Sequence, residues 1–228
     1  MANILQGRKQ AAGQHLALPY LAAGLIGLTC AGLLGRTLQT PTPMPAMNLQ
    51  QAVAYFDTGH LTAATIAFRT LANAGDPHAA YWYGHALERG LGTPVNVKAA
   101  MAEYARASSG AVMQADTRLG ELYLDGNAIP PDFAQARSYL TEAAKGGDAR
   151  AALDLGRIQR EGIGGPADPV AAYAWLEVAS LAGNAQAQQE RDRLLPTLSP
   201  AQQAEAIQEI GKIMPTVAGN TAARPAKT

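Results

Sequence analysis

Few side chains in this chain have a spacing that supports catalysis or metal binding. His78 and His85 are seven residues apart and would share one face of a helix, but no third ligand for zinc stands in register. Glu121 and Asp125 are four residues apart, a spacing that brings two carboxylates together for acid–base chemistry or leaves both on an exposed helix face. The sequence contains no S-x-x-K, G-x-S-x-G or H-E-x-x-H motif. We therefore predict no enzyme activity, no cofactor and no metal site.

The composition favours closely packed helices and excludes several classes of protein. Of the 228 residues, 48% are hydrophobic, 6% aromatic and 16% charged, as in a globular chain rich in small residues. The whole chain has 18 basic and 18 acidic residues, but the stretch from Met47 to Met214 has 13 basic against 18 acidic ones. A net acidic body repels phosphate backbones, so we predict no nucleic-acid partner. The single cysteine, Cys30, excludes an internal disulfide.

Residues 16–34 are an apolar segment without any charge, LALPYLAAGLIGLTCAGLL. As a helix the segment would be about 28 Å long, close to the roughly 30 Å of a bilayer core. Arg8 and Lys9 precede it and only Arg36 follows closely, so the positive-inside rule places residues 1–15 in the cytoplasm. A cleaved signal peptide and a buried helix are the alternatives. We predict a single-pass transmembrane helix in the inner (cytoplasmic) membrane, with the body in the periplasm of a bacterium.

Proline-rich segments lie on both sides of the predicted body. Residues 35–46 contain Pro41, Pro43 and Pro45, and this alternation favours an extended spacer over a helix. Residues 215–228 combine small, polar and proline residues, and we expect a disordered tail there.

A fixed period of 36 residues runs through the body. Three sets of small residues follow it: Gly84, Gly120 and Gly156; Gly90, Gly126 and Gly162; and Ala79, Ala115, Ala151 and Ala187. Three sets with one period predict a tandem array of identical structural units.

Each unit is predicted to be a pair of helices. The first helices, called A helices below, cover about 77–89, 112–124 and 148–160, and each ends at a glycine that supplies a left-handed turn. The second helices, called B helices, cover about 97–108, 133–145 and 169–182, with Asn96, Asp132 and Asp168 as N-caps. The glycines inside the A helices predict a close approach of the neighbouring helix.

Further helices are expected at both ends of the array. Residues 47–76 predict an N-terminal helical hairpin. Residues 188–214 predict capping helices, the last of which opens with Ser199 as N-cap and Gln202 completing a capping box. This last helix would cover the exposed edge of the stack.

The strings inside the units resemble the Sel1-like repeat family. The second unit carries the resemblance best, in Leu119–Gly126 (LGELYLDG), Asp132, Ala136 and Tyr139; the third matches at Leu155-Gly156, Gly162 and Trp175, and the first is looser. The match covers about 75–187. It implies an all-α, right-handed α/α solenoid with about three repeats in residues 77–187, related in shape to tetratricopeptide repeats.

The resemblance also implies a binding surface. By analogy with tetratricopeptide grooves, the A helices would line a concave face that takes a peptide or protein segment. The candidate groove residues are His78, Tyr81, His85, Glu88, Thr117, Glu121, Arg150, Arg157 and Arg160. Arg157 and Arg160 would bind a carboxylate of the partner and Tyr81 would be a rigid anchor, or the face is solvated and has no ligand.

The predicted function is a membrane-anchored, extracytoplasmic scaffold or adaptor for a protein partner whose identity the sequence does not give. The first alternative is a structural subunit of an envelope assembly, such as a secretion, conjugation or division apparatus, that uses the membrane helix for contacts. The second and weaker alternative is a peptidoglycan-related hydrolase, which the missing catalytic motifs disfavour.

Overall fold

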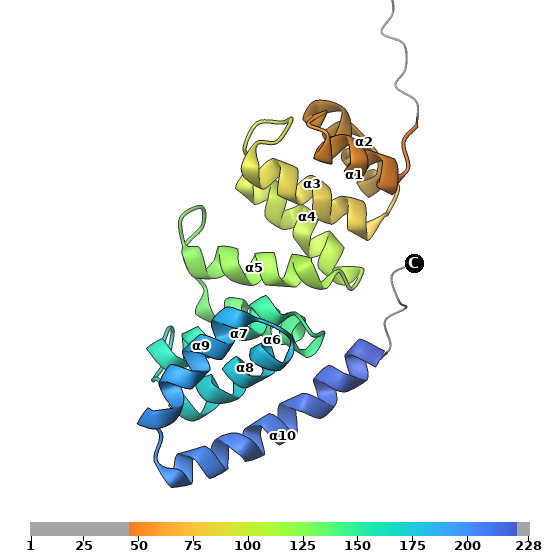
Figure 1. Ribbon diagram of the computed structural model, residues 1–228. Coiled ribbons are helices and arrows are strands. Elements are labelled where there is room, and N and C mark those ends of the chain that lie inside the picture. Colours follow the sequence, from red (N-terminus) through yellow and green to blue (C-terminus); the bar gives the residue numbers. More distant parts are fainter. Residues whose placement is uncertain (1–45, 223–228) are drawn as a thin grey trace, which may run out of the picture. The chain divides into compact units, whose positions relative to one another are not determined.

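The computed structural model describes residues 46–222, which form helices and no strands (Figure 1). The helices are α1 (Leu49–Asp57), α2 (Leu61–Asn73), α3 (Pro77–Arg89), α4 (Val97–Ser109), α5 (Met113–Asp125), α6 (Phe133–Lys145), α7 (Ala149–Glu161), α8 (Pro169–Leu181), α9 (Ala185–Leu194) and α10 (Pro200–Ala222). The predicted cytoplasmic head, the membrane helix at 16–34 and all but the last residue of the spacer lie outside this range. None of the described helices is long and apolar enough to span a membrane.

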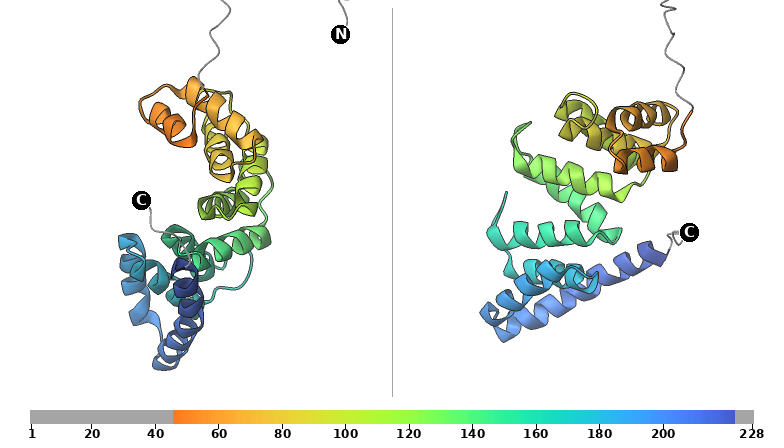
Figure 2. Two further views of the ribbon diagram at one scale, coloured as in Figure 1. Left: turned by 90° about the vertical axis from the view of Figure 1, so that its right-hand side faces the viewer. Right: turned by 45° about the horizontal axis from the view of Figure 1, so that its top comes forward.

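The helices pair in the predicted order. The A helices α3, α5 and α7 pack on the B helices α4, α6 and α8, respectively, and each B helix packs on the next A helix along the chain. The hairpins therefore stack in sequence order, from α1 and α2 through α8 and α9 (Figures 1 and 2). The predicted bounds of the A and B helices differ from the observed ones by at most one residue. The tandem array is confirmed.

Close contact between the A and B helices explains the glycines inside the A helices. A Cβ atom added to Gly120 would lie 2.5 Å from Leu140 Cγ, and one added to Gly156 would lie 2.7 Å from Leu176 Cγ. Leu140 and Leu176 have no exposed surface. The first repeat has the same arrangement at Gly84, which faces the ring of the fully buried Tyr104. Each glycine thus makes room for one large side chain of its own hairpin, as the sequence predicted.

Caps fix where each helix begins and ends. Gly90, Gly126 and Gly162 have φ of 71°, 68° and 67°, so the predicted left-handed ends of the A helices are confirmed. The side chain of Asp132 accepts hydrogen bonds from the backbone N–H groups of Ala134 and Gln135, and Asn96 and Asp168 cap their helices in the same way. These side chains satisfy backbone donors that a helix start would otherwise leave unpaired.

Ala111 occupies a turn position that is glycine in the neighbouring repeats. Gly75, Gly147 and Gly183, each a multiple of 36 residues away, have φ of 98°, 92° and 90°, whereas Ala111 is held at 59°. A Cβ atom in the left-handed region costs roughly 1–2 kcal/mol. We therefore expect Ala111→Gly to raise the free energy of unfolding by about 1 kcal/mol in urea titrations. Gly147→Ala should lower it, and a loss of stability in Ala111→Gly would contradict the account.

The C-terminal helix differs from its prediction in length and in position. α10 continues past Met214 to Ala222, so the prediction of disorder from residue 215 is wrong for residues 215–222. Pro215 lacks an amide donor, but the loss of one hydrogen bond does not oblige a helix to end. α10 also packs on both α8 and α6, with Ile213 and Met214 against the core beneath. It therefore bridges the B helices of two repeats, in addition to following the last hairpin.

Candidate binding face on the A helices

A network of ion pairs joins the first three A helices of the array. Arg118 of α5 pairs with Glu88 of α3 and with Glu121 of its own helix. Glu121 also pairs with Arg150 of α7, whose Nε lies 2.5 Å from Glu121 Oε1. Glu88 accepts a second hydrogen bond, 2.7 Å long, from the hydroxyl of the buried Tyr104. Side chains from three successive repeats are thus held together on one face, which we call the A-helix face.

A second cluster joins α7 to α9. Glu190 of α9 is 9% exposed, and it accepts hydrogen bonds from Arg157 Nη2 at 2.6 Å and from Arg160 Nη1 at 2.7 Å. Arg157 Nε donates a further bond at 3.1 Å. These bonds keep the pKa of Glu190 below its ordinary value, chiefly through Arg157. This carboxylate is therefore fixed and charged at neutral pH.

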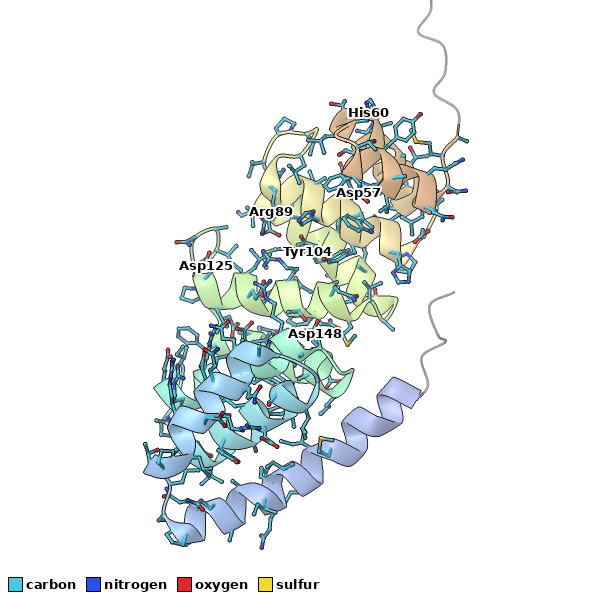
Figure 3. All side chains as sticks on the ribbon, in the orientation of Figure 1. Asp57, His60, Arg89, Tyr104, Asp125 and Asp148 are labelled. Carbon is cyan, nitrogen blue, oxygen red and sulfur yellow. The ribbon has the colours of Figure 1, made fainter. Side chains whose placement is uncertain are left out.

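A hollow of ≈ 430 Å³ opens at the first of these clusters. It is lined by Glu88, Arg118, Glu121, Leu122, Leu124, Asp125, Arg150 and Asp154, from α3, α5 and α7. One of these residues, Asp125, is labelled in Figure 3 and is the last residue of α5. The four carboxylates and two guanidinium groups give the lining a formal charge of −2 when all are ionised. A hollow of this size with converging polar groups is the usual form of a binding site.

Among the acids that line this hollow, Asp154 has the most strongly raised pKa. Burial, with a smaller contribution from the nearby charge of Glu121, raises its pKa to about 6. Its nearest cation is Arg157 of the same helix, whose Nη1 lies 3.8 Å from Asp154 Oδ1. Arg157 is already bonded to Glu190. Asp154 is therefore an acid for which the effect of burial outweighs the charges of Arg150 and Arg157.

Asp154→Asn is expected to stabilise the protein above pH 6. An acid whose folded pKa is raised destabilises the fold when it is charged, and this penalty disappears as the pH falls from about 6 toward 3.8. The difference between these pKa values corresponds to at most roughly 3 kcal/mol, and we expect about 1–3 kcal/mol at pH 7.5. Urea titrations at pH 7.5 and 4.5 should show this gain and its decrease to about a third. Asp125→Asn, at an exposed position, is the matched control and should change little.

The structure brings three of the predicted groove residues together. Glu88, Glu121 and Arg150 all line the hollow. The sequence assigned Arg157 and Arg160 to a carboxylate of the partner, whereas in the structure both bind the chain's own Glu190. Binding of a partner's carboxylate by these two arginines therefore requires competition with an internal ion pair.

The prediction for Thr117 is wrong. Thr117 is 4% exposed, and its hydroxyl donates a 3.0 Å hydrogen bond to Asp148 Oδ2. Asp148 is the N-cap of α7 and also accepts from the backbone N–H groups of Arg150 and Ala151. Because Thr117 is enclosed between two A helices, it holds the cap of α7 and has no surface for a partner.

The remaining candidates lie toward the N-terminal repeat. The ring of Tyr81 is half-buried, with its centroid 5.8 Å from those of Trp82 and Tyr104. His85 is also half-buried, 6.0 Å from the ring of Trp82, and burial lowers its pKa. His78 is exposed in the first turn of α3, about 15 Å along the helix from Glu88. Within residues 46–222 no three His, Cys, Asp or Glu side chains are grouped to hold a metal ion.

Three residues of the site were not predicted: Arg118, Asp154 and Glu190. They lie 36 residues apart, at the repeat position that Trp82 occupies in the first repeat. The signal that marks them is this register, since one repeat position is charged in three successive A helices, and Arg118 and Glu190 there pair with residues of the preceding A helix. The aromatic residue in the first repeat hides the pattern when single helices are examined.

The stacked hairpins define the class of the protein as an α/α solenoid. Three of its hairpins are Sel1 repeats: the model of the Sel1 repeat matches residues 77–110, 114–148 and 149–184. The matched segments agree with the three predicted units, so the resemblance seen in the sequence is confirmed. Sel1-repeat solenoids generally mediate protein–protein interactions.

A solved structure supports the fold. The chain is similar to a Sel1 repeat protein from Oxalobacter formigenes, with 24% identity and a TM-score of 0.59 over 63% of this chain and 59% of that one. It is also similar to a protective antigen of uropathogenic Escherichia coli that displays an SLR fold, with 19% identity and a TM-score of 0.45 over 78% of this chain and 49% of that one. This chain thus spans about half to three fifths of their length. The search of curated proteins found no match.

Proposed function

We propose that this protein is an interaction scaffold whose A-helix face binds a segment of a partner polypeptide. The observation that carries the proposal is the hollow between α3, α5 and α7, which converging charged side chains from three repeats line. Sel1 repeats are generally interaction modules without enzymatic activity, which supports this choice over a hydrolase.

The face is suited to binding because its side chains are held in place. Arg118 and Glu121 are fixed by ion pairs that cross from one repeat to the next. A binding surface that is already ordered loses less conformational entropy when a partner docks. Arg150, with 66% of its side chain exposed, remains available at the rim of the hollow for polar contacts.

We further propose that the scaffold is held at the inner membrane, with the repeats in the periplasm. Support comes from the uncharged segment at 16–34 and from the basic residues that precede it. A subunit of an envelope assembly remains the second candidate, favoured by the same segment if it contacts neighbouring membrane helices.

A photocrosslinking experiment in cells tests the binding face. A photoreactive phenylalanine analogue at position 150 of the full chain, on the A-helix face, should give discrete polypeptide adducts. The control carries the same group at position 142, an exposed position of the B helix α6. Adducts from position 142 with none from position 150 would overturn the proposal.

A further inference from the structure

The 36-residue register places two charged positions at each junction between A helices. One position holds Arg118, Asp154 and Glu190 in α5, α7 and α9. The other lies near the C-terminal end of the preceding A helix and holds Glu88, Leu124 and Arg160 in α3, α5 and α7. Each junction thus pairs one member of the first series with one member of the second.

Opposite charges meet at the first and last of these junctions. Arg118 pairs with Glu88 between α5 and α3. Glu190 pairs with Arg160 between α9 and α7, with the signs of the two charges reversed. The pairing thus recurs although the residue types differ, which shows that this junction position is built for an ion pair.

The middle junction, between α5 and α7, has no cation at the second of these positions. Asp154 of α7 occupies the position of Arg118 and Glu190, but its counterpart on α5 is Leu124, which carries no charge. Both residues line the hollow. The hollow therefore lies where Asp154 lacks the cation from the neighbouring A helix that the other two junctions have, and its one ion pair is with Arg157 of its own helix, 3.8 Å away.

We propose that Asp154 binds the cationic group of a lysine or arginine side chain that the partner polypeptide inserts into this hollow. The inserted cation takes the place that Arg160 occupies one junction further along the array. This inference rests on the proposed function, since it assigns the chemistry by which the A-helix face recognises a polypeptide.

The lining of the hollow matches a long basic side chain. Leu122 and Leu124 offer apolar surface for the methylene groups of the stem. Asp125 stands at the exposed rim and forms no ion pair with another described residue, so a second carboxylate is near the entering charge. Arg118 and Arg150 are both bonded to Glu121 and leave the lining with an excess of negative charge.

Titration with an amino-acid derivative tests the site directly. The probe is Nα-acetyl-lysine amide, and Nα-acetyl-norleucine amide has a similar stem without the charge. The full chain, in detergent or nanodiscs, is observed by carboxyl-detected NMR. We expect a saturable shift of the Asp154 signal with the lysine derivative and at least a fivefold weaker response to the norleucine derivative. Equal responses to both would overturn the inference.

Variants at position 124 provide a matched comparison. Leu124→Arg supplies the missing cation from within the chain and should abolish the response to the lysine derivative. Leu124→Met preserves the apolar lining and should retain the response. Asp154→Asn should remove it without loss of folding, as shown by an unchanged helical circular dichroism signal. Full binding in both Leu124→Arg and Asp154→Asn would contradict a role for this junction.

The crosslink at position 150 separates this inference from the proposed function. A polypeptide adduct that persists at full yield in Leu124→Arg and Asp154→Asn leaves the scaffold intact but overturns the lysine or arginine site. Saturable binding of the lysine derivative without any polypeptide adduct supports a cation site and overturns the proposed function. Loss of the adduct in the two variants, with retention in Leu124→Met, supports both.

Discussion

Replacing Glu190 by alanine should lower the free energy of unfolding by about 3 kcal/mol at pH 7. Glu190 is nearly buried and holds Arg157 and Arg160 through charged hydrogen bonds. Removing one partner of such a cluster leaves like charges close together without their counterion, which typically costs about 3–5 kcal/mol in a buried site. Both arginine side chains are about a third exposed, so we expect the lower end of this range.

Urea unfolding of the variant and of a control measures this effect. Glu161→Ala removes an exposed carboxylate that also pairs with Arg160, and it should cost less than about 0.5 kcal/mol. Because the pKa of Glu190 is lowered in the folded state, its stabilising effect is present above pH 4.5 and is lost as the pH falls through the lowered value. The difference between wild type and Glu190→Ala should therefore shrink at acid pH. A loss below 1 kcal/mol at pH 7 would show that the cluster does not join α7 to α9 in solution.

Gly120→Ala should also destabilise the protein, by about 2–3 kcal/mol. The added methyl group would lie 2.5 Å from Leu140 Cγ and 3.2 Å from the carbonyl oxygen of Ala136, so the two helices of the hairpin must move apart. Overpacking of this kind typically costs about 1–3 kcal/mol. Helix propensity alone predicts the opposite sign, because alanine favours a helix by about 1 kcal/mol over glycine.

A second glycine separates these two effects. Gly211 lies inside α10, and a Cβ atom added there meets no other atom within 4 Å. Gly211→Ala should therefore stabilise the protein by up to about 1 kcal/mol, while Gly120→Ala destabilises it. Thermal and urea unfolding of both variants provide the comparison. Stabilisation by both substitutions would mean that α5 and α6 are not in close contact.

Much of the fold could be predicted because its determinants are local. The period of 36 residues, the glycines that end the A helices and the N-caps such as Asp132 each act within a few residues of their position. The continuation of α10 beyond Pro215 could not be predicted this way, since a proline disfavours a helix without forbidding it. The bridging of α6 and α8 by α10 depends on packing between distant segments.

The site could be predicted only in part, for a related reason. The sequence placed the candidate groove on the A helices, and Glu88, Glu121 and Arg150 meet around one hollow there. Which residue of a helix face points outward and which points toward the next helix depends on small differences in rotation. Thr117 was therefore assigned to the surface although it is buried against Asp148. The pairing of Glu190 with two arginines links positions 30 and 33 residues apart, and only the packing of both α7 and α9 on α8 brings them together.

The claim that the A-helix face binds a polypeptide is tested most directly by mapping a bound segment. Once the adduct at position 150 identifies the crosslinked sequence, that segment is synthesised and titrated into the isotopically labelled protein. Backbone NMR signals from α3, α5 and α7 around the hollow should shift in a saturable manner, and those of α4, α6 and α8 should change little. Shifts concentrated on the B helices or on α10, with the A-helix face unaffected, would contradict the account.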